Sequence, residues 1–121
     1  METILDTNFV IACVRNNIEF IEQLKLEGFR VIIPKEVLEE MKDLRQKVSR
    51  DERLAIDIGM DIISKSKIEK MKLPKGKVDE GLIQLGKKGA YIATLDKTIR
   101  SIVPNKIGIS QAKNSILIER K

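Results

Sequence analysis

Short runs of β-branched and other apolar residues alternate along this chain with longer segments whose apolar residues recur at helical spacing. This alternation constrains the fold most, because consecutive parallel strands need a long connection between them, usually a helix. The first strands are expected in four short runs, at residues 3–5, 30–33, 68–73 and 91–95. The helices that connect or flank them are expected at residues 8–26, 35–44, 50–63 and 78–88.

The end of the chain follows a different pattern. A short helix is predicted at residues 97–102, before Pro104, and two final strands at residues 106–109 and 115–119, joined as a hairpin. The whole order predicts an α/β fold, a three-layer α-β-α sandwich with a central, mostly parallel sheet and right-handed crossovers. The 121 residues suit a single domain over residues 1–121.

The composition limits the chemistry that the chain can perform. Histidine is absent and Cys13 is the single cysteine, which excludes Ser-His and Cys-His catalysis, zinc sites built on histidine or thiolates, and an internal disulfide. A resident metal would therefore be a hard cation held by oxygen ligands.

The net charge of +5 suits a polyanionic partner, although lysine-rich surfaces also serve solubility. No long apolar run or signal peptide is present, so we expect a cytoplasmic protein without membrane contact.

Two aspartates follow predicted strands directly. Asp6 comes after residues 3–5, and Asp96 comes after residues 91–95. Ligands of open α/β sheets bind beyond the carboxyl ends of the strands, so both side chains are expected at one edge of the sheet. Helix capping is the alternative explanation, because each aspartate also precedes a predicted helix.

Two further acids are distinguished by their phase on predicted helices. Glu40 lies at the margin of the apolar stripe of its helix, and Asp79 lies within the apolar arc of the helix at residues 78–88. A carboxylate inside an apolar arc costs stability unless it is paired or binds a metal. The neighbouring Glu39 and Glu80 are expected to be ordinary solvated acids.

Four short segments around these acids carry a family resemblance. The segments ILDTN, IPKEVLEEM, VDEGLI and ATLDK resemble, in this order, the four motifs of PIN domains, and they place Asp6, Glu40, Asp79 and Asp96 at the acidic positions. The resemblance is collinear over nearly the whole chain. It implies a Rossmann-like PIN fold, dependence on Mg²⁺ or Mn²⁺, and ribonuclease activity in which the four acids bind the metal.

The resemblance also implies partners and supporting residues. Stand-alone PIN proteins include toxins with a small antitoxin, ribosomal RNA processing enzymes and RNA quality-control factors, and homodimers are common. Thr94 matches the usual hydroxyl companion of the fourth acid, and with Asn8 it is expected to orient water or phosphate oxygens. Alternatively, Asn8 caps the first helix and Thr94 simply fills a strand position. The segment after Asp96 lacks the further acid of some members. Four acids can still hold one well-formed metal, and a second metal would be recruited only with substrate.

Basic residues near the motifs are candidates for contact with RNA phosphates. They are Lys42, Arg45, Lys72, Lys75, Lys77 and Lys97. The alternative is a solvated surface with no binding role. Because aromatic residues make up only 3% of the chain, base stacking is poorly provided for, and recognition of the RNA backbone is favoured.

Three other functions remain open on the sequence. A catalytically silent PIN scaffold would act by binding alone, but it would be expected to lack one or more of the acids. A phosphoacceptor receiver domain would need an aspartate at the end of its third strand. In a purely structural alternative, all four acids cap helices or form pairs, which explains Asp6 and Asp96 better than Glu40 and Asp79.

Overall fold

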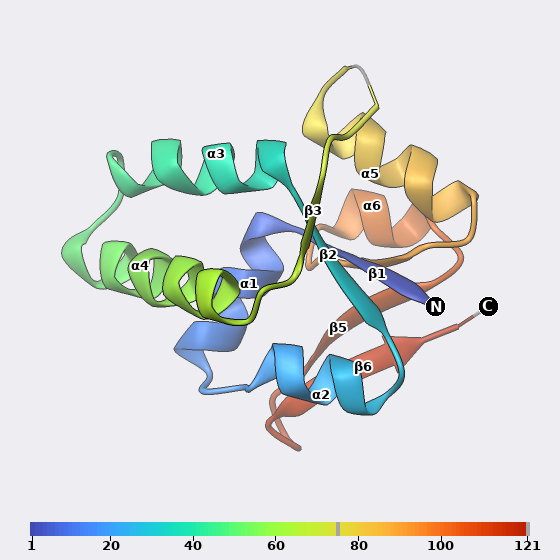
Figure 1. Ribbon diagram of the computed structural model, residues 1–121. Coiled ribbons are helices and arrows are strands. Elements are labelled where there is room, and N and C mark those ends of the chain that lie inside the picture. The colour runs from blue at the N-terminus through green and yellow to red at the C-terminus, as the bar shows by residue number, and fades with distance from the viewer. Residues whose placement is uncertain (75, 121) are drawn as a thin grey trace.

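A computed structural model of the chain describes residues 1–74 and 76–120. The described residues form six strands and six helices (Figure 1). The strands are β1 Glu2–Leu5, β2 Arg30–Pro34, β3 Glu69–Met71, β4 Tyr91–Ala93, β5 Lys106–Ser110 and β6 Ser115–Glu119. The helices are α1 Thr7–Arg15, α2 Phe20–Leu26, α3 Lys35–Arg45, α4 Arg50–Lys65, α5 Val78–Lys87 and α6 Lys97–Ile102. Within this described part, none of the helices has the length and apolar character that crossing a membrane requires.

The six strands form one sheet in the order β3-β2-β1-β4-β5-β6. Strands β1 to β5 are parallel, and β6 returns antiparallel to β5 as the predicted hairpin. In the middle of the sheet, Ile4 of β1 is in register with Ile32 of β2 and with Ile92 of β4. The predicted α/β class with a mostly parallel central sheet is confirmed.

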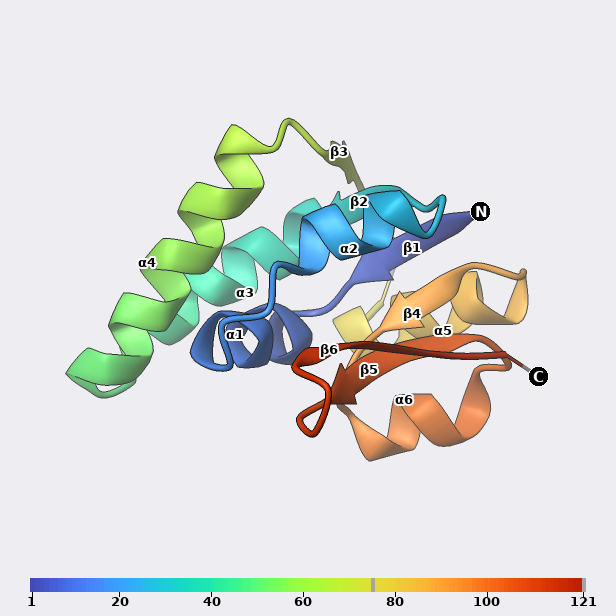
Figure 2. The ribbon, with the colours of Figure 1, turned by 90° about the horizontal axis from the view of Figure 1, so that it is seen from below.

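The strand residues alternate between the two faces of the sheet, and each face is covered by helices. Leu5, Ile33 and Ala93 belong to a large core formed with α1, α2, α3 and α4. Ile4, Ile32 and Ile92 belong to a smaller core formed with α5 and α6. Figure 2 shows α6 beneath β5 and β6, on the side away from α2 and α4. The molecule thus has the three layers that the sequence pattern predicts.

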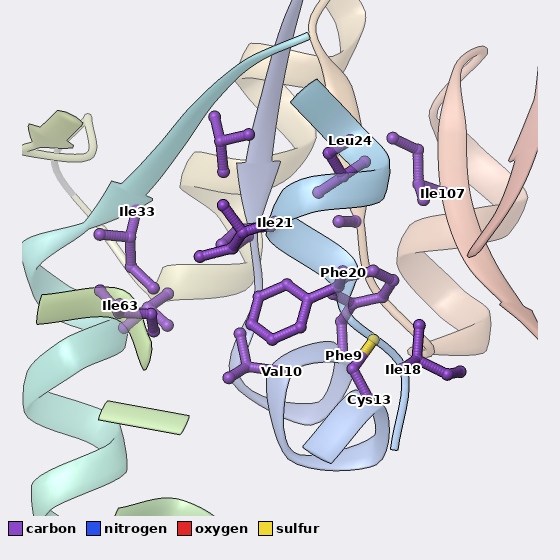
Figure 3. Packing of buried hydrophobic residues seen from close by; sticks show 14 of the residues in the cluster. Phe9, Val10, Cys13, Ile18, Phe20, Ile21, Leu24, Ile33, Ile63 and Ile107 are labelled. Carbon is purple, nitrogen blue, oxygen red and sulfur yellow. The ribbon is translucent and has the colours of Figure 1, made fainter. Parts of the chain in front are cut away.

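The larger core is built around an aromatic contact between α1 and α2. The rings of Phe9 and Phe20 meet edge to face, with 6.0 Å between their centroids, and Cys13 lies beside them (Figure 3). Burial raises the pKa of the Cys13 thiol to about 12, which keeps it protonated at neutral pH. Cys13 is therefore a buried small side chain and not a reactive thiol.

The helix predicted over residues 8–26 is in fact two helices, α1 and α2. Asn16 ends α1, and Asn17 has a φ of 53°, in the left-handed region that favours asparagine and glycine. The backbone N–H of Ile18 donates to the carbonyl of Cys13, and that of Asn17 donates to the carbonyl of Val14. This pair of bonds terminates α1 as a Schellman motif and lets α2 turn back over the core.

One hydroxyl of the sheet interior has no hydrogen-bond partner. The Thr3 Oγ1 atom is fully buried, and it makes no bond to any other described residue. Because a buried unpaired hydroxyl costs stability, Thr3→Val is expected to raise the free energy of unfolding by about 1 kcal/mol. Urea denaturation measures the change. Thr3→Ser, which keeps the hydroxyl and loses the methyl group, should be destabilised; equal stability of the three proteins would contradict the prediction.

Candidate active site

The sheet order creates a topological switch point between β1 and β4. The chain passes from β1 to β2 and β3 on one side, and β4 then begins the other half of the sheet. In such folds the crevice beyond the carboxyl ends of these two strands is where ligands bind. Asp6 follows β1, and Thr94 and Asp96 follow β4, so these three residues lie at the switch point.

Asp6 is the buried acid of this site. Its exposed fraction is 6%, and its backbone N–H donates to the Ala93 carbonyl at 2.9 Å, which continues the pairing of β1 with β4. Its carboxylate accepts bonds from the Thr7 N–H at 2.8 Å and from the Thr94 hydroxyl at 2.7 Å. The pKa of Asp6 is raised by burial, the bonds from Thr94 and Thr7 lower it in part, and the negative charges of Glu40 and Asp79 raise it further.

A hydrogen-bond network connects the segment after β4 to α1. The Thr94 hydroxyl accepts from the Asp96 N–H at 3.1 Å, in addition to its bond to Asp6. The Asn8 side-chain oxygen accepts from the Leu95 N–H at 3.0 Å. Asn8 therefore does not cap the first helix, since the Asp6 side chain occupies the N-cap, and Thr94 does more than fill a strand position.

The capping explanation holds for Asp96 and does not exclude a second role. One oxygen of its carboxylate accepts from the Ile99 N–H at 3.0 Å and caps α6. A carboxylate has further lone pairs on both oxygens. Asp96 also lines the same pocket as Asp6, so the residue both starts α6 and contributes a negative charge to the crevice.

All four predicted acids line this one pocket, whose volume is about 520 Å³. Glu40 and Asp79 are both exposed. This agrees with the predicted position of Glu40 at the margin of its apolar stripe, whereas Asp79, predicted within an apolar arc, is not enclosed by it. The apolar residues around them face the sheet, while the margins of α3 and α5 face the open crevice. The Thr7 hydroxyl donates to Glu40 and ties α3 to α1. Thr7 was not among the predicted site residues, although it lies within the first motif.

The donor set of the pocket suits a hard divalent cation. It consists of carboxylate oxygens with a neighbouring amide, which are the ligands that Mg²⁺ and Mn²⁺ take. A cation would also relieve the repulsion that Glu40 and Asp79 exert on the buried Asp6. Over residues 1–74 and 76–120, no three acidic or cysteine side chains are arranged as a ready metal cluster. Binding through one or two carboxylates and several waters, as is usual for Mg²⁺, fits this arrangement.

The predicted basic residues have different surroundings. Four of them are exposed: Lys42, Lys72, Lys77 and Lys97. Arg45 instead forms a two-bond ion pair with Asp57, at 2.6 and 3.2 Å. Lys75 lies outside the described residues. Arg15 lines the acidic pocket and was missed, although its helical spacing from Asn8 could have revealed it.

The fold and the pocket define an open α/β protein with an acidic crevice at its switch point. The chain belongs to the PIN-like family, because the family described as "PIN like domain" matches residues 3–110. The solved structure of the PIN domain endonuclease Utp24 is similar, with a TM-score of 0.78 and 20% sequence identity, covering 99% of this chain and 92% of that chain. That likeness shows the fold. No curated protein sequence matches the chain significantly.

The structure gives no support to the receiver alternative. A receiver-like fold has the strand order 2-1-3-4-5, which differs from the order found here. The third strand, β3, is followed by Lys72 and Leu73, so the aspartate that phosphate transfer would need is absent from its end.

Proposed function

We propose that this protein is a divalent-metal-dependent endoribonuclease, with Asp6, Glu40, Asp79 and Asp96 as its metal-binding and catalytic acids. The observation that supports the proposal best is the environment of Asp6. A buried carboxylate faces the charges of Glu40 and Asp79 in a crevice at the switch point of the sheet. Folding around such a repulsive cluster costs stability, so a function that uses the charges is the better explanation.

The residues of the site would have different roles. Asp6 and Asp96 would hold the cation, with Glu40 and Asp79 contributing directly or through water. Mg²⁺ or Mn²⁺ supplies the positive charge that a phosphodiester needs during substitution at phosphorus. The Thr94 hydroxyl favours the ionised form of Asp6 by donating to it, and Asn8 fixes the 94–96 segment by accepting from Leu95.

RNA is the proposed substrate because the resemblance of the four motifs to PIN domains implies ribonuclease activity. Two observations support a nuclease. Membership of the PIN-like family suggests a nuclease, and the similar structure is that of an endonuclease. Lys42 and Lys97 are exposed on α3 and α6. Glu40 is also on α3, and Asp96 directly precedes α6, so the positions of the two lysines suit contact with the charged RNA backbone. An antitoxin, another RNA-processing protein and a second copy of the chain stay predicted partners.

Cleavage of RNA with Mn²⁺ tests the proposal. Wild type should cut structured or single-stranded RNA, whereas Asp79→Asn and Asp96→Asn should each lose activity by roughly a hundredfold, because several kcal/mol of charge stabilisation are removed. The matched control is Glu80→Gln. Glu80 is next to Asp79, in the same first turn of α5, but it does not line the pocket, so this variant should cut like wild type.

Two outcomes would contradict the assignment. Equal cleavage by all four proteins would show that the acids are not catalytic. Binding of RNA without any Mn²⁺-dependent cleavage by wild type would instead support the silent scaffold.

A further inference from the structure

One helix face runs from the acids to an arginine at the far end of the pocket. Asn8, Ile11, Ala12 and Arg15 all line the pocket, and their spacing places them on the same side of α1. Leu44 of α3 lines the opposite wall. The crevice therefore has negative charge at one end, apolar side chains in its middle and a guanidinium at the other end.

Arg15 does not neutralise the acids of the pocket. In the described part of the chain, its side chain forms neither an ion pair nor a hydrogen bond, and the charges that act on the Asp6 pKa come from Glu40 and Asp79. Arg45, on α3, does have a carboxylate partner. An exposed guanidinium that lines an acidic pocket without pairing to it is available for a ligand anion.

We propose that Arg15 binds a phosphate of the RNA backbone adjacent to the scissile phosphate, and so positions the strand across the acids. The inference rests on the proposed nuclease function and deepens it. It adds a second anion subsite to a crevice whose other polar groups are almost all acceptors.

The dimensions of α1 suit this arrangement. Asn8 and Arg15 are seven positions apart, which corresponds to roughly 10 Å along the helix axis. The guanidinium has a planar set of donors that matches a phosphate. Ile11 and Leu44, between the two ends, offer an apolar surface to a sugar or a base. One strand of RNA can thus contact the acids, through a cation, and Arg15 at the same time.

A simple stabilising role for Arg15 is the competing explanation. Arg15 is in the last turn of α1, where a positive charge interacts favourably with the helix dipole. That role would change the thermal stability of the protein and leave its RNA affinity unchanged. Affinity and the salt dependence of binding therefore separate the two explanations.

The first experiment measures binding without catalysis. A fluorescent single-stranded oligoribonucleotide is titrated, in a chelator, with wild type, Arg15→Gln, Arg15→Lys and Arg30→Gln. Arg30 is the matched control, because it is an exposed arginine at the start of β2, on the opposite edge of the sheet. Arg15→Gln should bind roughly tenfold more weakly, with a salt slope smaller by about 0.7. Arg15→Lys should recover part of the affinity, and Arg30→Gln should match wild type.

The second experiment locates the contact on the RNA. Cleavage with Mn²⁺ is compared on RNA oligomers that carry one neutral methylphosphonate linkage, placed next to the scissile bond on either side. At one of these positions the neutral linkage should raise KM for wild type, while Arg15→Gln, which has already lost the contact, should be insensitive to it.

The outcomes separate this inference from the proposed function. Equal affinity and equal salt slope for wild type and Arg15→Gln overturn the role of Arg15, even if both cleave RNA. The same loss in Arg30→Gln overturns it as well, because the effect would then be one of net charge. Arg15-dependent binding without Mn²⁺-dependent cleavage supports phosphate binding by Arg15, but it overturns the nuclease and, with it, the position of this phosphate next to a scissile bond.

Discussion

Asp6→Asn is expected to abolish Mn²⁺-dependent cleavage and, at the same time, to stabilise the metal-free protein at neutral pH. Activity should fall by at least a factor of roughly 100, because Asp6 is one of the proposed metal ligands. Stability should rise because a buried charge facing Glu40 and Asp79 is removed. The introduced amide keeps the geometry, since its oxygen accepts from Thr7 and its NH₂ group donates to Thr94, whose hydroxyl turns to Asn8, 3.4 Å away.

The stability difference between Asp6→Asn and wild type is expected to depend on pH. The folded-state pKa of Asp6 is raised above the ordinary value of 3.8, so between these two pKa values the folded protein binds more protons than the unfolded chain. The contribution of Asp6 to stability is therefore full below the unfolded pKa and is lost as the pH rises through the folded pKa. The stability difference between Asp6→Asn and wild type should grow over this window and stay constant above it.

Denaturation in a chelator, across this pH range, measures the difference, and a parallel series with Mn²⁺ completes the test. Added Mn²⁺ should raise the melting temperature of wild type by mass action and leave that of Asp6→Asn unchanged. A metal-free Asp6→Asn protein less stable than wild type at neutral pH would show that the Asp6 bonds outweigh its repulsion. Equal Mn²⁺ shifts in the two proteins would remove Asp6 from the metal site.

Gly86→Ala is expected to destabilise the fold by about 2 kcal/mol, although alanine is the better helix former. Gly86 is in α5, where it packs against the end of α6. A methyl group there would lie 2.9 Å from Val103 Cβ and 3.0 Å from Ile92 Cγ1, and it would come closer still to Val103 Cγ1. Both neighbours are buried, so neither can move without disturbing the smaller core.

A double-mutant cycle with Val103→Ala tests the cause. If the clash with Val103 is responsible, Gly86→Ala should cost less in the Val103→Ala background, with a coupling of about 1 kcal/mol or more. Gln84→Ala, an exposed position on the same helix, is the control and should change stability by less than about 0.5 kcal/mol. A Gly86→Ala protein more stable than wild type would mean that α5 and α6 separate at little cost.

The strand ends were the most predictable part of the site. Asp6 and Asp96 follow short apolar runs that can be recognised as strands from the local sequence alone. In a parallel sheet the carboxyl ends of such strands lie at one edge. Helix boundaries were less predictable. The apolar residues of 8–26 keep a helical period across Asn16 and Asn17, and the break depends on the left-handed backbone at Asn17, which brings Phe20 against Phe9.

Burial of the acids could not be predicted from helix phase. Phase fixes which residues of one helix share a side, but whether that side meets another element or an open crevice depends on how the helices pack. Glu40 and Asp79 are near apolar residues on their own helices and are nevertheless exposed at the pocket. Asp6 is the buried acid because α1, β4 and the 94–96 segment close around it.

The sequence by itself determined the α/β class, the order of elements apart from the break between α1 and α2, and the positions of four acids: Asp6 and Asp96 follow strands, and Glu40 and Asp79 lie on helices. These properties follow from local periodicity and from chain connectivity. The tertiary structure alone decided that β1 and β4 are neighbours, that their two acids share a pocket with Glu40 and Asp79, and that Arg15 lies at its far end. These properties depend on contacts between residues up to about ninety positions apart, such as Thr94 with Asp6, and no local pattern encodes such contacts.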